Sequence, residues 1–97
     1  MRQVIIAESA REDLLSIGEF VAQRNHEAAF RLMERFREKF NLLAKFPHLG
    51  RERDDILLGL RCLIVNEYLI FYQLNKDSIE IWRVRHSAQS PDDLLDV

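Results

Sequence analysis

The residues with the clearest chemical potential lie near the end of the chain, where Arg83, Arg85 and His86 close a run of β-type sequence. Side chains two apart in a strand share a face. This alternation predicts two sets, Ile79, Ile81, Arg83 and Arg85 on one face and Trp82, Val84 and His86 on the other. Guanidinium groups suit phosphates and carboxylates, so the two arginines could converge with Arg61 on such an anion. The alternative is that they pair with acidic residues of the chain, namely Glu67, Glu80 or the Asp residues of the tail.

Proton transfer has three candidate carriers, which are His86 and, on the central loop, His48 and Glu52. Histidine exchanges protons near neutral pH, so His86 could act as a general acid or base beside the arginines. For the two loop residues, a structural role is the favoured interpretation. No P-loop, dinucleotide fingerprint, nucleophile elbow or His-Glu-x-x-His helix occurs. Cys62 is the single cysteine, so no disulfide or zinc site is expected. We therefore predict neither a cofactor nor a metal ion.

The composition indicates one folded domain spanning residues 1–97, with 47% apolar residues and little Gly or Pro. The apolar run from Val4 to Ala7 is too short for a signal peptide or a membrane span. Together with the lone cysteine, this favours a cytoplasmic protein without membrane association. The net charge of -2 and the pI of about 5.9 argue against a strongly basic nucleic-acid binder. The stretch from Arg31 to Arg61 is locally positive, which also fits a solvated helix face.

Hydrophobic periodicity predicts a first strand and then two antiparallel helices. Ser9 and Glu12 form a capping box that predicts the first helix start. That helix carries an apolar stripe of Leu14, Ile17 and Val21, widened by Ala10, Leu15 and Ala22. A break near Arg24–His26 separates it from a second helix, whose core face consists of Ala29, Met33, Phe36, Phe40 and Leu43. Pro47 and Gly50 stop the second helix.

Beyond this stop, the period of the apolar residues changes to two, which predicts three strands over Leu60–Val65, Tyr68–Leu74 and Ile79–Val84. The short breaks between them predict an antiparallel meander. The tail, Ser90–Leu95, carries helix-start signals and is predicted to form one short helical turn. The predicted fold is therefore α+β, in the order β-α-α-β-β-β.

An ordered set of short motifs resembles the RelE/ParE toxin superfamily over nearly the whole chain, and within it the ParE-like branch. The motifs are Ser9-Ala-x-x-Asp-Leu, Phe46-Pro-x-x-Gly-Arg, Gly59-Leu-Arg61, Tyr68-Leu-Ile-Phe-Tyr72 and Ile81-x-Arg-Val-x-His86. The resemblance implies the toxin of a type II toxin-antitoxin system, able to arrest growth and to stabilise a plasmid. It also implies a cognate antitoxin encoded next to it, bound in a hetero-oligomeric complex.

Within this resemblance, ParE relatives inhibit DNA gyrase by binding it, without a catalytic residue set. The corresponding target-binding residues here would be Arg61, Arg83, Arg85 and His86. RelE relatives are instead ribosome-dependent mRNA endonucleases, and that alternative would use Arg51 or Arg53 with Arg61, Arg83 and His86. The second alternative is an inactive homologue that only binds an antitoxin.

The predicted fold also offers two ways for an antitoxin to bind, by strand addition at an open sheet edge or by a helix in a groove. We expect Phe20, Phe30 and Trp82 to be buried in the core, with partial exposure at such a surface as the alternative. The sequence leaves the edge and the stoichiometry open.

Overall fold

The computed structural model describes residues 2–89 and has a mixed α+β architecture. The elements are β1 (Gln3–Ile6), α1 (Glu8–Ala22), α2 (His26–Lys45), β2 (Arg51–Glu52), β3 (Leu60–Val65), β4 (Tyr68–Leu74) and β5 (Ser78–His86). They form one sheet in the order β1-β5-β4-β3-β2, in which β1 runs parallel to β5 and the other neighbours are antiparallel. The predicted fold class is confirmed. The two-residue β2 was not predicted, and the helical turn predicted for the tail lies outside the described residues.

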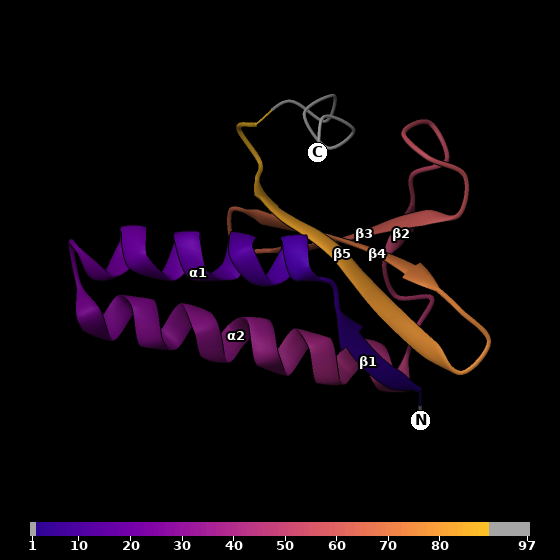
Figure 1. The fold of residues 1–97 in the computed structure, drawn as a ribbon, viewed down its shortest axis with the longest axis horizontal. Coiled ribbons are helices and arrows are strands. Elements are labelled where there is room, and N and C mark those ends of the chain that lie inside the picture. The colour runs from indigo at the N-terminus through magenta and orange to yellow at the C-terminus, as the bar shows by residue number, and fades with distance from the viewer. Residues whose placement is uncertain (1, 90–97) are drawn as a thin grey trace.

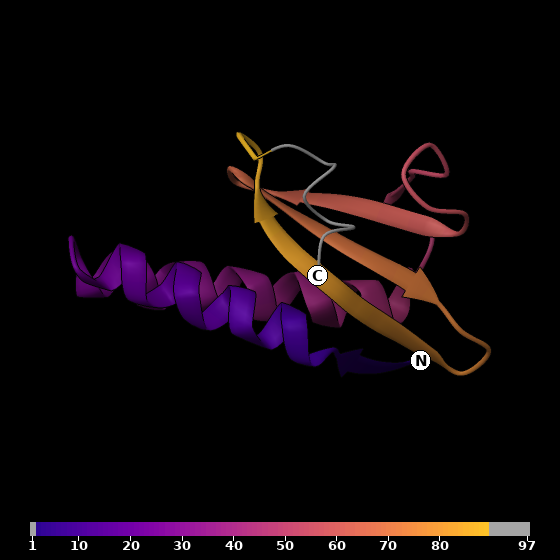
Figure 2. The ribbon, with the colours of Figure 1, turned by 45° about the horizontal axis from the view of Figure 1, so that its top comes forward.

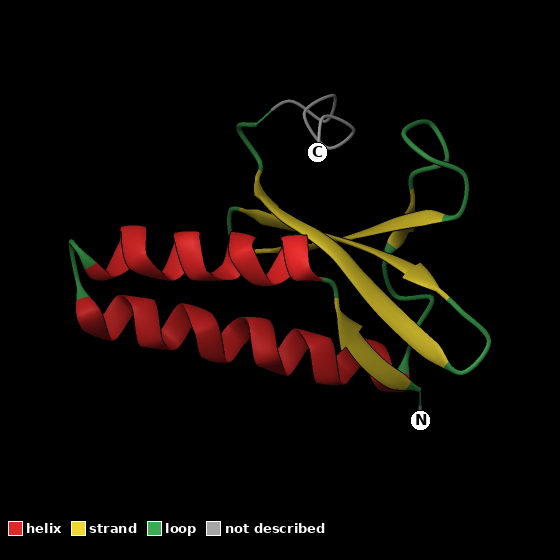
Figure 3. Cartoon of the chain, in the orientation of Figure 1, coloured by secondary structure: helices red, strands yellow, loops and turns green. Residues whose placement is uncertain are grey.

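The two helices lie side by side as an antiparallel hairpin that covers one face of the sheet (Figures 1 and 2). The opposite face carries no helix in residues 2–89; we call it the open face. The loop between β2 and β3 projects beyond the sheet at the end away from the helices (Figure 3). None of the helices in the described part of the chain is both long and apolar enough to cross a bilayer.

The start of α1 differs from the capping-box prediction. The helix begins at Glu8 and its N-cap is Ala7, which provides no side-chain cap. Ser9 already lies in the first turn, and its hydroxyl donates a hydrogen bond to the Trp82 carbonyl at 3.2 Å. The prediction was wrong because this hydroxyl connects the helix to β5 instead of capping it. Leu15 was also misplaced, since it is exposed and does not belong to the buried stripe.

The second helix follows its prediction. Asn25 is the N-cap, and its side chain accepts a hydrogen bond from the Ala28 amide at 3.1 Å. The buried face consists of Ala29, Leu32, Phe36, Phe40, Leu43 and Ala44. Met33 is partly buried against the same core. This face packs on the sheet and forms one side of the main core.

The sheet separates two apolar clusters of unequal size. The main cluster lies between the sheet and the helices, and from β4 and β5 it includes Ile70, Tyr72, Ile79, Ile81 and Val84. The smaller cluster consists of Leu60, Cys62 and Phe71, with Ile56, Leu69 and Trp82 packed against it. Since Ile56 belongs to the loop after β2, that loop covers part of the open face.

A β-bulge at Trp82 changes the predicted faces of the last strand. Phe71 lies opposite Arg83, but the next residue, Tyr72, lies opposite Ile81, so Trp82 is an extra residue without a partner. Residues directly opposite each other in an antiparallel pair share a face. The register therefore places two sets on opposite faces: Ile79, Ile81, Val84 and His86 toward the helices, and Arg83 and Arg85 on the open face. The alternation predicted from the sequence was wrong beyond Ile81, because one inserted residue reverses every later side chain.

Candidate functional site

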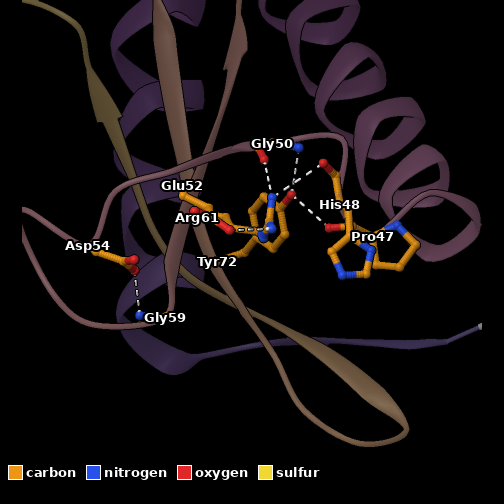
Figure 4. Close-up of polar contacts among 8 residues, drawn as sticks. All are labelled: Pro47, His48, Gly50, Glu52, Asp54, Gly59, Arg61 and Tyr72. Atoms are coloured by element: carbon orange, nitrogen blue, oxygen red, sulfur yellow. Dashed lines mark hydrogen bonds and ion pairs between the residues drawn. The ribbon is translucent and has the colours of Figure 1, made fainter.

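Arg61 binds the segment that connects α2 to β2 (Figure 4). It lies opposite Tyr72 on β4, and therefore on the helix-covered face. Its Nη1 donates to the carbonyl oxygens of Gly50 at 2.6 Å and His48 at 3.3 Å, and its Nη2 lies 3.1 Å from Glu52 Oε1. With 15% of the side chain exposed, the guanidinium is largely occupied by the chain's own backbone.

Tyr72, on the helix-covered face of β4, also hydrogen-bonds the segment between α2 and β2. Its hydroxyl accepts a hydrogen bond from the Gly50 amide at 2.7 Å and donates one to the Pro47 carbonyl at 2.9 Å. Burial raises the pKa of Tyr72. A Cβ on Gly50 would lie 2.4 Å from the Tyr72 hydroxyl oxygen, so only glycine fits at this position. The Pro47 and Gly50 motif thus forms one hydrogen-bonded unit with Tyr72 and Arg61.

Arg83 forms a largely buried ion pair with Asp13 of α1. Its Nε and Nη2 donate to the two carboxylate oxygens at 2.8 and 3.0 Å, and the Val84 amide donates to Asp13 Oδ2 at 3.0 Å. The hydrogen bond to Asp13 raises the pKa of Arg83. The pair forms beyond the end of β1, whose pairing with β5 stops at Ile6. The sequence-based alternative of internal ion pairing is therefore realised for Arg83, although the partner is an aspartate that was not considered.

His86 is held at the end of β5 by short-range contacts. Its Nδ1 accepts a hydrogen bond from the Ala88 amide at 3.0 Å, and its Nε2 lies 3.6 Å from a Glu67 oxygen. Its ring stands edge-on to Tyr68, with the centroids 5.3 Å apart. Arg85 lies opposite Leu69, on the other face of the sheet.

A cavity of about 540 Å³ opens beside His86, between α1 and the ends of β4 and β5. Its lining consists of Ser16, Ile17, Phe20, Tyr68, His86 and Gln89. The expected core burial was wrong for Phe20, which is 55% exposed, and for Phe30 on α2, which is exposed as well. Trp82 is partly buried on the open face. The size and the mostly apolar lining suit an apolar group of a binding partner. The sequence predicted a groove and Phe20 as candidates for such a surface, but it did not place His86 or Tyr68 beside them.

The predicted functional residues do not converge. Arg61 is aligned with Tyr72 and His86 with Tyr68, which separates them by about 13 Å along the strands and about 10 Å across them. The Arg61 guanidinium also points toward β2, away from β5. Arg51 is exposed on β2, His48 is exposed, and Glu52 pairs with Arg61. Within residues 2–89, no group of three or more His, Cys, Asp or Glu residues is arranged to hold a metal ion.

Comparisons with known proteins agree with this fold and with the family resemblance. The family model described as the ParE toxin of the type II toxin-antitoxin system parDE matches residues 4–91. Toxin ParE3 of Caulobacter vibrioides is 32% identical over 85 residues, covering 87% of this chain and 85% of the relative. Toxin RelE2 of the same organism is 32% identical over 89 residues, covering 92% and 99%.

A solved structure has the same fold. It is the chromosomal ParDE toxin-antitoxin system from P. aeruginosa, which matches with a TM-score of 0.75 and 20% identity over 89% of this chain and 96% of the other. This likeness concerns the fold alone, whereas the family model covers most of the sequence. The chain therefore belongs to the ParE toxin family of type II toxin-antitoxin systems.

Proposed function

We propose that this toxin arrests growth by binding DNA gyrase, and that a cognate antitoxin encoded next to it neutralises it in a hetero-oligomeric complex. The observation that carries the proposal is the internal use of Arg61 and Arg83, which are held by backbone carbonyls and by Asp13. Neither guanidinium is presented to a scissile phosphate. His86 and the cavity beside it offer a surface for target recognition.

Messenger RNA cleavage makes demands that this arrangement does not favour. It needs a base for the ribose 2′-hydroxyl, cations for the developing charge on phosphorus and an acid for the leaving oxygen, all within reach of one phosphate. The candidate set for that chemistry, Arg51, Arg61, Arg83 and His86, is distributed over both faces of the sheet and one edge strand. Binding to a protein target requires no such convergence.

The direct test is supercoiling by purified gyrase with and without this protein. We expect inhibition that weakens when Phe20→Ser removes one wall of the cavity, because Phe20 is an exposed part of it. Phe30→Ser is the matched control, since Phe30 is also exposed but lies on α2 outside the cavity. An unchanged supercoiling rate at large molar excess of toxin would contradict the proposal.

The similarity to a toxin named RelE2 keeps a ribosome-dependent endonuclease as a second candidate. That activity would appear as cleavage of a translated message on ribosomes, lost in His86→Ala and retained in Phe30→Ser. Induction of the toxin without its antitoxin distinguishes both activities from a third possibility, an inactive antitoxin-binding homologue. Unimpaired growth on induction would favour the inactive homologue.

A further inference from the structure

The edge of β5 that faces β1 and α1 has two kinds of hydrogen-bonding partner. The backbone of β1 pairs with this edge as far as Ile81. Beyond Ile81, side chains of α1 bind the edge instead. The Ser9 hydroxyl donates to the Trp82 carbonyl at 3.2 Å, and Asp13 Oδ2 accepts a hydrogen bond from the Val84 amide at 3.0 Å. The start of α1 thus provides the partners that a neighbouring strand would otherwise provide.

These two α1 contacts depend on the bulge at Trp82. In a regular strand, the polar groups of consecutive residues point to opposite edges. Here the consecutive carbonyls of Ile81 and Trp82 both accept hydrogen bonds from the start of α1, at 2.9 and 3.2 Å, so both face the same edge. The bulge therefore turns the later residues by one step, and this step directs the Val84 amide to Asp13.

A regular β5 would present a different residue at the cavity. In the bulged register, His86 lies opposite Tyr68. If Trp82 instead took a place in the ladder opposite Phe71, every later residue would move by one position. Arg85 would then lie opposite Tyr68. The register of β5 thus decides whether an imidazole or a guanidinium group borders the cavity.

The helix α1 connects the two contacts to the cavity. Asp13 lies one turn before Ser16 and Ile17, which line the cavity beside His86. A second hollow of about 150 Å³ has Asp13 and His86 together in its lining. Because the same helix provides a wall of the cavity and binds the edge of β5, its contacts fix His86 relative to that wall.

We propose that Ser9 and Asp13 are positioning residues of the target-recognition surface, which hold β5 in the bulged register so that His86 borders the cavity. Both contacts exist only in this register, because a regular strand would turn the Trp82 carbonyl and the Val84 amide toward β4. Burial of the Val84 side chain, which is 1% exposed, acts in the same direction. This inference rests on the proposed function, in which the surface recognises gyrase.

Two substitutions test the structural part of the inference. Ser9→Ala deletes the hydroxyl, and Asp13→Asn replaces the carboxylate by a neutral amide, which accepts hydrogen bonds more weakly. In the double variant, the Val84 amide should exchange with solvent at least about tenfold faster. The NOE between the Tyr68 and His86 rings, whose centroids lie 5.3 Å apart, should weaken. Ser9→Thr retains a hydroxyl and should preserve this NOE.

An unchanged NOE between the two rings in the folded double variant would overturn the inference. If the double variant fails to fold, Ser9→Ala alone carries the same test. This measurement requires no gyrase, so it decides the role of Ser9 and Asp13 even if the toxin leaves supercoiling unaffected and the proposed function fails.

Inhibition of gyrase supercoiling separates positioning from stability. The double variant should need about tenfold more toxin than the wild type for half-inhibition, because His86 no longer has a fixed place beside the cavity. Tyr72→Phe is the matched control, since it removes a hydroxyl that bonds Gly50 and Pro47 but does not line the cavity. It should weaken inhibition less than about twofold, because distant sites act independently. Equal losses of inhibition at equal losses of stability in urea would overturn the inference.

Discussion

Replacing Asp13 by alanine is the most informative perturbation of this fold. The Asp13 and Arg83 side chains are 15% and 10% exposed, so the substitution leaves a guanidinium in a largely buried position without its counter-ion. It also removes the acceptor of the Val84 amide. Breaking a buried pair in this way costs about 3–5 kcal/mol, out of a total stability of about 5–15 kcal/mol. We therefore expect Asp13→Ala to lose a large fraction of the free energy of unfolding.

Urea denaturation and thermal unfolding, both followed by circular dichroism, measure this loss. At roughly 4–8 °C per kcal/mol for a domain of this size, the Tm should fall by about 12 °C or more. Glu12→Ala is the matched control, because Glu12 is the exposed neighbour of Asp13 on α1. We expect its free energy of unfolding to stay within about 0.5 kcal/mol of the wild type.

A double-mutant cycle then separates the ion pair from its surroundings. Replacing both partners with leucine, as Asp13→Leu with Arg83→Leu, should recover much of the stability that either single change loses, because no uncompensated charge remains. The reasoning is refuted if Asp13→Ala costs less than about 1 kcal/mol, or if the two leucine substitutions are simply additive. Support for it would assign Arg83 primarily to the architecture of the toxin.

Three further expectations concern the α2–β2 connection and the open face. Tyr72→Phe removes a hydroxyl that bonds Gly50 and Pro47, and should cost about 1–3 kcal/mol in urea unfolding. Gly50→Ala places a methyl group against the Tyr72 ring and should lower the free energy of unfolding at least as much. Adding Tyr72→Phe to Gly50→Ala should not fully restore this stability, because ring carbons also lie within 2.8 Å of the new Cβ. Burial raises the pKa of the Cys62 thiol, so iodoacetamide should react with it more slowly in the folded protein than in urea at pH 8, and stability should decline as the pH rises through the thiol range. Equal alkylation rates in both states would contradict the last expectation.

The helices and strands could be predicted from the sequence because their apolar residues follow periodic patterns. The second helix has apolar residues at steps of three and four, and its predicted face is the buried one, from Ala29 to Leu43. The strand boundaries at Leu60, Val65, Tyr68 and Leu74 were also predicted correctly, since short polar breaks mark the turns. Local sequence signals were sufficient to predict an element where its local conformational preference agreed with its tertiary packing.

The features that the sequence analysis predicted wrongly or did not predict have a common physical cause. Contacts with residues distant in the sequence override the local preferences. Ser9 has the sequence context of an N-cap, but the Trp82 carbonyl receives its hydroxyl. β2 is too short to carry a periodic signal and exists because β3 provides hydrogen-bonding partners for it. Asp13 was not considered as a partner of Arg83 because 70 residues separate them in the chain. Such pairings depend on the assembled sheet and cannot be read from spacing.

The bulge at Trp82 explains why the arginines of this chain do not form one site. Without the extra residue, Arg83 and Arg85 would share a face with Ile79 and Ile81, as the alternation predicted, and this is the helix-covered face that also carries Arg61. The bulge moves both to the open face and brings His86 to the same face as Tyr68, beside the cavity next to α1. One inserted residue thus places Arg83, which is buried against Asp13, on the face opposite His86 and the apolar cavity. Arginines separated in this way do not converge on a single phosphate, and this geometry is the structural support for the proposed binding function.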